Sequence, residues 1–349
     1  MIGITRIGFY NFYEIYNNNR MFDPGFQASI GDDLLYPFHH LARVARQKGI
    51  GISTIDTAPL DSYDTIIFFD FPGTHNTYLK EAIRINPDNL VLFLFENEII
   101  RPDNWRPENY LPFKQVFTWK DTLVDENRIF KFFLPNKIVK NVSFNGSSKT
   151  KFCCMISGNK ALFHPLELYS ERIRAVRWFE KNNPDCFDLY GIGWDNPFPL
   201  LPPRVSGLLK PLFSLFPPRY PSSCGTVTTK NTILKQYKFS ICYENARDIP
   251  GYITEKIFDC FFSGCVPVYR GAPNITDYIP EDTFIDRRKY GSYAELFEYL
   301  KIMSLEEYQE YIKSIESFVN SPDIFPFSAE NFADTVLHKT VPFSGSVTE

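Results

Sequence analysis

Short, continuous apolar runs alternate with longer amphipathic segments along the chain. In the first part, four such runs predict strands: Arg6–Tyr10, Ile50–Ile55, Thr65–Asp70 and Leu90–Phe95. Apolar residues at helical spacing between Leu34 and Ala45 predict a helix that ends at Gly49. Runs that are apolar throughout, rather than at every second position, are typical of parallel strands buried on both faces. The pattern therefore predicts an α/β fold with an open sheet and right-handed crossovers.

A polar segment near the middle of the chain predicts a domain boundary. Residues 141–151 read NVSFNGSSKTK, which is rich in Asn, Ser and Gly, as linkers tend to be. A second α/β series follows, with strands predicted at Phe152–Ile156, Phe187–Tyr190, Phe239–Tyr243 and Val266–Tyr269, a helix at Ser170–Glu180, and capping boxes at Ser292-x-x-Glu295 and Ser304-x-x-Glu307. We expect one domain over residues 1–148, a second over 149–335 and a polar tail over 336–349.

A Pro-rich stretch, Pro197–Pro221, interrupts this second series. It is long enough to serve a purpose. Its mixture of Leu, Phe, Lys and Arg allows two interpretations. The stretch either touches a membrane face or an acceptor lipid, or forms an irregular insertion packed on its own domain.

Composition and charge narrow the class of protein. Hydrophobic residues make up 44% of the 349 residues and charged residues 22%, which is typical of a globular chain of about two domains. The net charge of −4 argues against a dedicated nucleic-acid binder, so an anionic ligand has to meet a local basic cluster. The longest apolar runs are far shorter than the roughly 18 residues that cross a bilayer. The first residues show no secretory signal pattern.

The seven cysteines, an odd number without a CxxC pair, fit neither a disulfide scaffold nor a zinc site. Cys242, Cys260 and Cys265 lie in apolar runs and are expected to be buried thiols. These features favour a cytoplasmic protein.

The most informative segment runs from Tyr237 to Asp286. Its first strand leads into polar residues beginning at Glu244, at the carboxyl end where open α/β sheets bind ligands. A helix is predicted to begin near Thr254 and to end at Gly264. Lys256 therefore lies in the first turn of a helix whose free N–H groups suit a phosphate; alternatively, it is a solvated surface lysine.

The same segment resembles the donor-binding motif of the α1,3/4-fucosyltransferases, glycosyltransferase family 10. The resemblance rests on five ordered blocks: Tyr243-Glu244-Asn245, Gly251-Tyr252-Ile253-Thr254-Glu255-Lys256, Gly264-Cys265-Val266-Pro267-Val268, Gly271-Ala272-Pro273 and Phe284-Ile285-Asp286. Several blocks in order are far more specific than one short pattern. The resemblance implies a GT-B fold, with two Rossmann-like domains facing each other across a cleft. It also implies GDP-fucose as donor, held by the second domain, and inversion at the anomeric carbon.

The resemblance further implies which residues contact the donor: Asn245, Tyr252, Glu255 and Lys256, with Glu244 either a contact or a residue that shapes the loop. It also implies one arginine aimed at the diphosphate from the first helix of the donor domain. Arg172 aligns best, and Arg174 is its rival; because the two point in different directions on a helix, only one should reach the ligand. An arginine suits this task because its planar fork binds phosphate oxygens bidentately.

Members of this family carry a catalytic carboxylate after a strand in the first domain. Glu96, which follows the run Leu90–Phe95, is the corresponding candidate for the general base, and Glu98 is a supporting candidate. Taken alone, a glutamate that follows an apolar strand is more often a loop or cap residue. The sequence holds no D-x-D triplet of the kind that binds a divalent ion in other glycosyltransferases. We therefore expect a reaction without metal or other cofactor.

These features predict an inverting glycosyltransferase that moves fucose from GDP-fucose to a hydroxyl of an oligosaccharide or glycolipid acceptor. The expected linkage is α1,3 to a GlcNAc-type sugar in a surface glycan or O-antigen. The expected location is the cytoplasm, with peripheral contact at the inner membrane as an option. Two alternatives stay open: the same fold using another GDP-sugar, and an inactive glycan- or nucleotide-binding protein.

Overall fold

A computed structural model describes residues 5–26, 28, 33–144, 149–194, 208 and 219–340. The contacts divide the chain into two units. Unit 1 holds Met1–Ile138, Pro250–Tyr252 and Asp323–Glu349, and unit 2 holds Val139–Ile249 and Ile253–Pro322. The division therefore falls about ten residues before the predicted boundary at 148, and the end of the chain belongs with unit 1. Most of the Pro-rich stretch 197–221 lies outside the described residues.

Unit 1 contains a parallel sheet whose strands follow the order β2-β1-β3-β4-β5-β6. The strands are β1 Arg6–Asn11, β2 Gly51–Thr54, β3 Thr65–Phe69, β4 Leu90–Leu94, β5 Gln115–Thr118 and β6 Ile129–Lys131. All five residues of β3 and of β4 are buried, as continuous apolar runs predict. The strand order reverses between β1 and β3, which makes this pair the topological switch point of unit 1.

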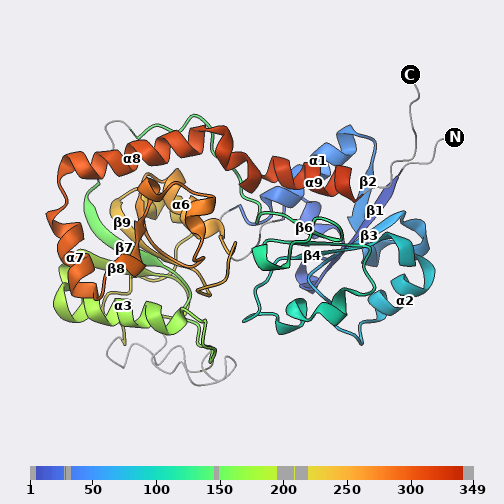
Figure 1. Cartoon of the computed structure of the whole chain (residues 1–349), viewed down its shortest axis with the longest axis horizontal. Coiled ribbons are helices and arrows are strands. Elements are labelled where there is room, and N and C mark those ends of the chain that lie inside the picture. Colours follow the sequence, from blue (N-terminus) through green and yellow to red (C-terminus); the bar gives the residue numbers. More distant parts are fainter. Residues whose placement is uncertain are drawn as a thin grey trace. The chain divides into compact units, whose positions relative to one another are not determined.

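Three helices cover this sheet: α1 Tyr36–Gln47, α2 Thr77–Ile85 and α9 Ala329–Lys339. The crossovers β1–α1–β2 and β3–α2–β4 run in opposite directions along the sheet, so right-handed connections place α1 and α2 on opposite faces. The last helix, α9, packs beside α1 (Figure 1).

The predicted polar tail over 336–349 needs a correction, because α9 continues to Lys339. Val336 and Leu337 are buried in it. The apolar face of this helix packs within unit 1, so its residues belong to the core rather than to a tail. Residues 341–349 lie outside the described residues.

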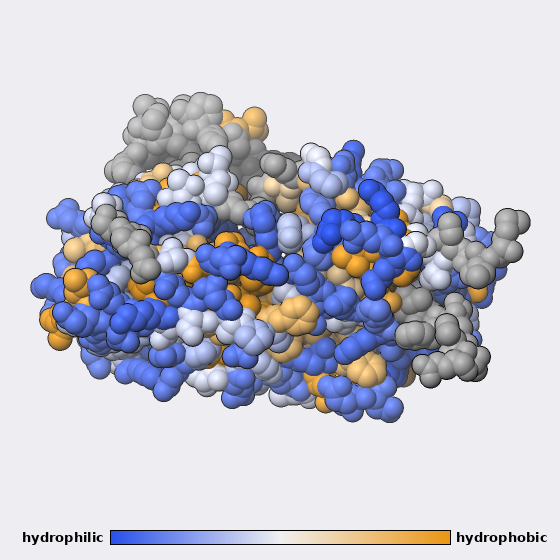
Figure 2. Space-filling model, turned by 90° about the horizontal axis from the view of Figure 1, so that it is seen from above, coloured by the Kyte–Doolittle hydropathy of each residue, from blue (hydrophilic) through white to orange (hydrophobic). Residues whose placement is uncertain are grey.

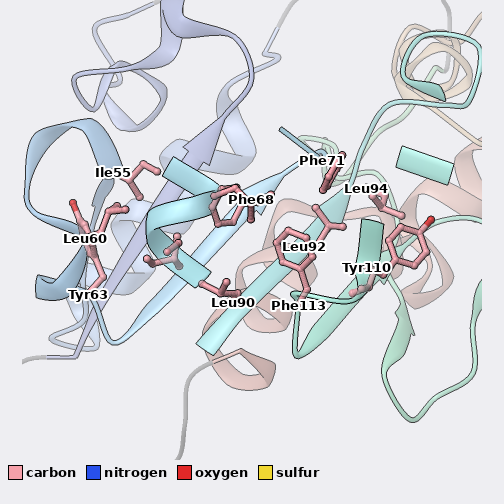
Figure 3. Packing of buried hydrophobic residues seen from close by; sticks show 14 residues of the cluster. Ile55, Leu60, Tyr63, Phe68, Phe71, Leu90, Leu92, Leu94, Tyr110 and Phe113 are labelled. Atoms are coloured by element: carbon pink, nitrogen blue, oxygen red, sulfur yellow. The ribbon is translucent and has the colours of Figure 1, made fainter. Parts of the chain in front are cut away.

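One face of the unit 1 sheet is packed by aliphatic and aromatic side chains. Leu90, Leu92 and Leu94 alternate along β4 and point to the same side, where Phe68 of β3 and Phe113 meet them (Figure 3). All five side chains are at most 1% exposed. This close packing holds β3 and β4 in place. It therefore also positions the residues that follow each strand.

Unit 2 contains a second parallel sheet, in the order β11-β10-β9-β7-β8. Its strands are β7 Lys151–Ile156, β8 Phe187–Tyr190, β9 Tyr237–Tyr243, β10 Val266–Arg270 and β11 Ile285–Asp286, and its helices are α3 Tyr169–Asn182, α5 Lys230–Leu234, α6 Glu255–Phe262, α7 Tyr293–Ile302 and α8 Leu305–Asn320. The helices α3 and α6 lie on opposite faces of the sheet (Figure 1). The switch point of this sheet lies between β7 and β9.

The local signals for the helices of unit 2 are confirmed. Ser292 and Ser304 accept hydrogen bonds from the backbone N–H groups of Glu295 and Glu307, which caps α7 and α8. Gly264 has a φ of +59° directly after α6, which is the left-handed conformation that glycine adopts most easily.

None of the helices in the described part of the chain is long and apolar enough to cross a membrane. On the face seen in Figure 2, hydrophilic side chains predominate and apolar ones form small separate patches.

Candidate active site

The carboxyl end of the unit 2 sheet carries a pocket at the switch point between β7 and β9. The pocket is partly open to solvent and small, with a cavity volume of about 30 Å³. Three cationic side chains line it, those of Arg172, Lys230 and Lys256. The sequence predicted two of them.

Arg172 lies on α3 and reaches the end of β9. One terminal nitrogen of its guanidinium donates to the backbone carbonyls of Tyr243, at 2.7 Å, and Glu244, at 2.9 Å, and to the side-chain oxygen of Asn245, at 3.1 Å. Arg172 is only 4% exposed. These contacts hold a buried positive charge against the loop that leaves β9.

Arg174, the rival of Arg172, points elsewhere. Its side chain is 69% exposed and pairs with Glu171 at 3.2 Å. The two arginines lie two positions apart on one helix, so they face different directions, as expected. Of the two, Arg172 lines the pocket.

Glu244 organises the start of α6. Its two carboxylate oxygens accept hydrogen bonds from the backbone N–H of Thr254, at 2.8 Å, and from the Thr254 hydroxyl, at 2.7 Å. The Lys256 ammonium lies 3.3 Å from the same carboxylate, whose side chain is fully buried. Thr254 also caps α6. Glu244 therefore shapes the loop and positions Lys256, which is the second of the two roles predicted for it.

The charges around the first turn of α6 reinforce one another. Burial alone would raise the pKa of Glu255, but Lys256 and Lys230 outweigh it and lower that pKa to about 2. Burial alone would lower the pKa of Lys256, but Glu255 and Glu244 raise it above its usual value. Both groups are therefore charged at neutral pH, and Lys256 presents a permanent cation at a helix N-terminus.

Lys230 and Asp259 are two pocket residues that sequence reasoning missed. The Lys230 ammonium lies 2.6 Å from the Asp259 carboxylate, with the side chains 21% and 24% exposed. Burial lowers the pKa of Lys230, but Asp259 and Glu255 outweigh it and raise the pKa overall. A lysine at the start of a short helix has no local signature. The available signal was Asp259, one turn after Glu255 on the same helix face.

Tyr252 belongs to unit 1, unlike the other predicted donor residues. It is 3% exposed, and its hydroxyl accepts a hydrogen bond from the Asn97 side chain at 2.7 Å. Its ring packs on that of Trp119, with 4.7 Å between centroids. Within unit 2, the structure thus brings together Arg172, Glu244, Asn245, Glu255 and Lys256. Tyr252 and Glu96 lie in unit 1.

Glu96 follows β4 at the carboxyl end of the unit 1 sheet. One of its carboxylate oxygens accepts a hydrogen bond from the Tyr13 hydroxyl at 3.2 Å, and its backbone N–H donates to Asp70 at 3.1 Å. Glu98, the supporting candidate, instead pairs with Lys120 at 2.7 Å. Glu98 therefore neutralises a lysine of its own unit.

Asp70, which comes directly after β3, holds the loop that carries Glu96. One oxygen of its carboxylate accepts from the backbone N–H groups of Phe95 and Glu96 and from the side chain of Asn104. Burial, with a further contribution from Glu96, raises the pKa of Asp70 to about 6. Its φ of +63° lies in the left-handed region, which aspartate tolerates better than most residues other than glycine. No local sequence pattern distinguishes it from the many aspartates that end a strand.

Within the described ranges, no three His, Cys, Asp or Glu side chains gather in a way that could hold a metal ion. Cys242, Cys260 and Cys265 are buried thiols, as predicted.

Comparisons with known proteins agree with this geometry. Residues 222–322 match the family model described as glycosyltransferase family 10 (fucosyltransferase) C-term. An alpha-(1,3)-fucosyltransferase of Helicobacter pylori is 36% identical over 77 residues, which are 22% of this chain and 16% of that protein. An alpha-(1,4)-fucosyltransferase of Arabidopsis thaliana is 43% identical over 68 residues, 20% of this chain and 17% of the relative. The matched segment thus spans less than a fifth of either relative.

Solved structures resemble the chain over more of its length. An alpha1,3-fucosyltransferase with GDP-fucose matches with a TM-score of 0.56 and 15% identity, covering 99% of this chain and 93% of that one. An alpha1,3-fucosyltransferase with GDP matches with a TM-score of 0.51 and 18% identity over 88% and 81% of the two chains. These likenesses confirm the GT-B fold. The family model confirms, over residues 222–322, the resemblance to glycosyltransferase family 10 seen in the motifs.

Proposed function

We propose that the chain is a fucosyltransferase that moves fucose from GDP-fucose to a hydroxyl of an oligosaccharide or glycolipid acceptor, with inversion at the anomeric carbon. The observation that carries this proposal is the basic pocket at the carboxyl end of β9 in unit 2, where Arg172, Lys230 and Lys256 gather. Lys230 and Lys256 lie in the segment that matches the fucosyltransferase family model, and Arg172 precedes it. The proposed acceptor is a GlcNAc-type sugar of a surface glycan or O-antigen, joined in α1,3-linkage.

The pocket supplies what a departing nucleoside diphosphate requires. Negative charge builds up on the diphosphate as the bond to the sugar breaks, and preorganised cations stabilise it most at that moment. Lys256 and Arg172 are held in place by Glu244 and by backbone carbonyls before any ligand arrives. The N-terminus of α6 adds the partial positive charge of the helix dipole. We propose that these groups replace a divalent ion.

The acceptor hydroxyl needs a base, because a sugar hydroxyl is a poor nucleophile at neutral pH. We propose Glu96 for this role. General-base catalysis typically contributes 10²–10⁴-fold to the rate. The resulting transition state has oxocarbenium character, as in other glycosyl chemistry. A reducing, cytoplasmic setting is part of the proposal and is supported by the free thiols of all seven cysteines.

The direct test is GDP release from purified protein incubated with GDP-fucose and a panel of oligosaccharide acceptors, with GDP-mannose as the competing donor. We expect release from GDP-fucose that depends on one acceptor class. If GDP is released from GDP-mannose and not from GDP-fucose, the donor is GDP-mannose and the proposed donor is wrong. GDP binding without release from any donor would instead support a nucleotide-binding protein without catalytic activity.

A further inference from the structure

We infer that Phe12 and Tyr13, the residues that follow β1, form an aromatic platform that binds the pyranose ring of the acceptor and presents its hydroxyl to Glu96. This inference rests on the proposed function and deepens it by assigning the acceptor subsite to named residues.

Topology places this segment where a ligand is expected in unit 1. The strand order reverses between β1 and β3, and in open α/β sheets ligands bind outside the carboxyl ends of the strands at such a point. Asn11 ends β1 and pairs with Phe69 at the end of β3. Phe12 and Tyr13 come next along the chain, and Glu96 follows β4, the neighbour of β3.

The aromatic residues change from buried to exposed at this edge. Phe9, within β1, is fully buried, whereas Phe12 is 40% and Tyr13 45% exposed. Their rings meet edge to face with 5.5 Å between centroids, and Tyr16 continues the row at 6.3 Å from Tyr13. Contiguous exposed aromatic rings beside a polar group are one feature of ligand-binding surfaces.

A pyranose fits this surface better than a purely apolar partner does. Its C–H groups pack against an aromatic face, while its hydroxyls need hydrogen-bonding partners nearby. The platform offers both, because the Tyr13 hydroxyl and the Glu96 carboxylate lie 3.2 Å apart at its edge. The Arg101 guanidinium lies 3.6 Å from the centre of the Phe12 ring and covers one of its faces. The sugar therefore packs on the opposite face of Phe12 and on Tyr13.

The hydrogen bond from Tyr13 gives this residue a second role. By donating to one oxygen of Glu96, the hydroxyl orients the carboxylate and stabilises its charged form. Asp70 fixes the backbone of the same loop. Tyr13 is thus a positioning residue for the base as well as a wall of the acceptor subsite.

Two variants test these roles separately. Phe12→Ala removes half of the platform and should raise the KM for the acceptor about tenfold. Tyr13→Phe keeps the ring and loses only the hydroxyl. It should lower kcat several-fold and move the acid limb of the pH–rate profile to higher pH, since the carboxylate loses a hydrogen bond to its charged form. Leu111→Ala, at an exposed site of unit 1, is the matched control.

An unchanged acceptor KM in Phe12→Ala, or wild-type kcat and pH profile in Tyr13→Phe, would overturn the inference while leaving the proposed function intact. If the wild-type protein shows no turnover, the proposed function fails, but the platform can still be tested by binding. Saturation-transfer NMR with N-acetyllactosamine should show transfer from aromatic protons in the wild type and its loss in Phe12→Ala. No transfer to the wild type, or equal transfer to both, would contradict the platform.

Discussion

At the scale of single residues, the cations of the pocket are prepared by their neighbours. Glu244 is fully buried and compensated by Thr254 and Lys256. Arg172 is fixed by backbone carbonyls. Preorganisation of this kind matters because a charge that does not have to reorganise stabilises the transition state at no further cost.

Lys230 allows the pocket to be tested with a residue that the sequence did not suggest. Lys230→Met should weaken GDP binding by roughly 10- to 100-fold, as expected for the loss of a charge-assisted contact of about 1.5–3 kcal/mol. Lys151→Met is the control, since Lys151 pairs with Asp188 at the amino end of β7, away from the pocket. Isothermal titration with GDP measures both. Equal affinities in the two variants would exclude Lys230 from the site.

The proposal that these cations act without a metal ion is tested by removing metal ions from the protein. Protein treated with EDTA should keep its full rate of GDP release, and added Mg²⁺ or Mn²⁺ should not raise it. Loss of activity that Mg²⁺ or Mn²⁺ restores would show that the cations do not neutralise the diphosphate alone.

Asp70 predicts a specific dependence of stability on pH. Its pKa is raised to about 6 from the usual 3.8, so the folded state holds this proton more tightly than the unfolded state does. Its contribution to folding is therefore most favourable below pH 4 and is lost as the pH rises to about 6. Asp70→Asn keeps an oxygen acceptor but cannot ionise, so the variant does not lose stability as the pH rises. The variant should exceed the wild type in free energy of unfolding by on the order of 3 kcal/mol above pH 7 and by little at pH 4.

Urea denaturation at pH 4 and at pH 7.5 measures this difference, with the exposed Asp61→Asn as control. A constant difference at both pH values would show that Asp70 is not the titrating group.

At the scale of elements, the strands and helices with a strong local sequence pattern were predicted well. The strands β1, β2, β3, β4, β7, β8, β9 and β10 and the helices α1, α3 and α6 lie within about two residues of their predicted bounds. Short β5 and β6, α2 and α9 were not predicted. The helix α9 was missed because its apolar face packs on α1 and on Phe69 and Phe93 of β3 and β4, which lie more than 200 positions earlier in the chain.

Two glycines that follow helices differ in a testable way. Gly49, after α1, has a φ of +69° with open space around it, and Gly264, after α6, has a φ of +59° with the Phe144 ring 2.6 Å from where a Cβ would lie. Gly49→Ala should cost about 1–2 kcal/mol of stability through its backbone conformation alone. Gly264→Ala should cost clearly more, because Phe144 must also move. Thermal unfolding of both variants compares them, and equal costs would contradict the packing at Gly264.

At the scale of the whole molecule, the candidate site was only partly predictable. The motif around Glu244 and Lys256 is contiguous, so the sequence contains it. Asp70 and Tyr13 act on Glu96 across 26 and 83 positions of the chain, and Lys230 meets Asp259 across 29. Only the folded sheets bring such residues together. The sequence could therefore identify the family motif but not the residues that support it.

The central claim is that unit 2 binds the GDP group and unit 1 supplies the base. Paired measurements of GDP affinity and turnover test it most directly. Glu96→Gln, in unit 1, should reduce kcat by about 10²–10⁴-fold while leaving the Kd for GDP within about twofold. Lys256→Met, in unit 2, should raise that Kd at least tenfold, in keeping with a lost contact to a charged group. Equal loss of GDP affinity in both variants, or full turnover in Glu96→Gln, would contradict the account.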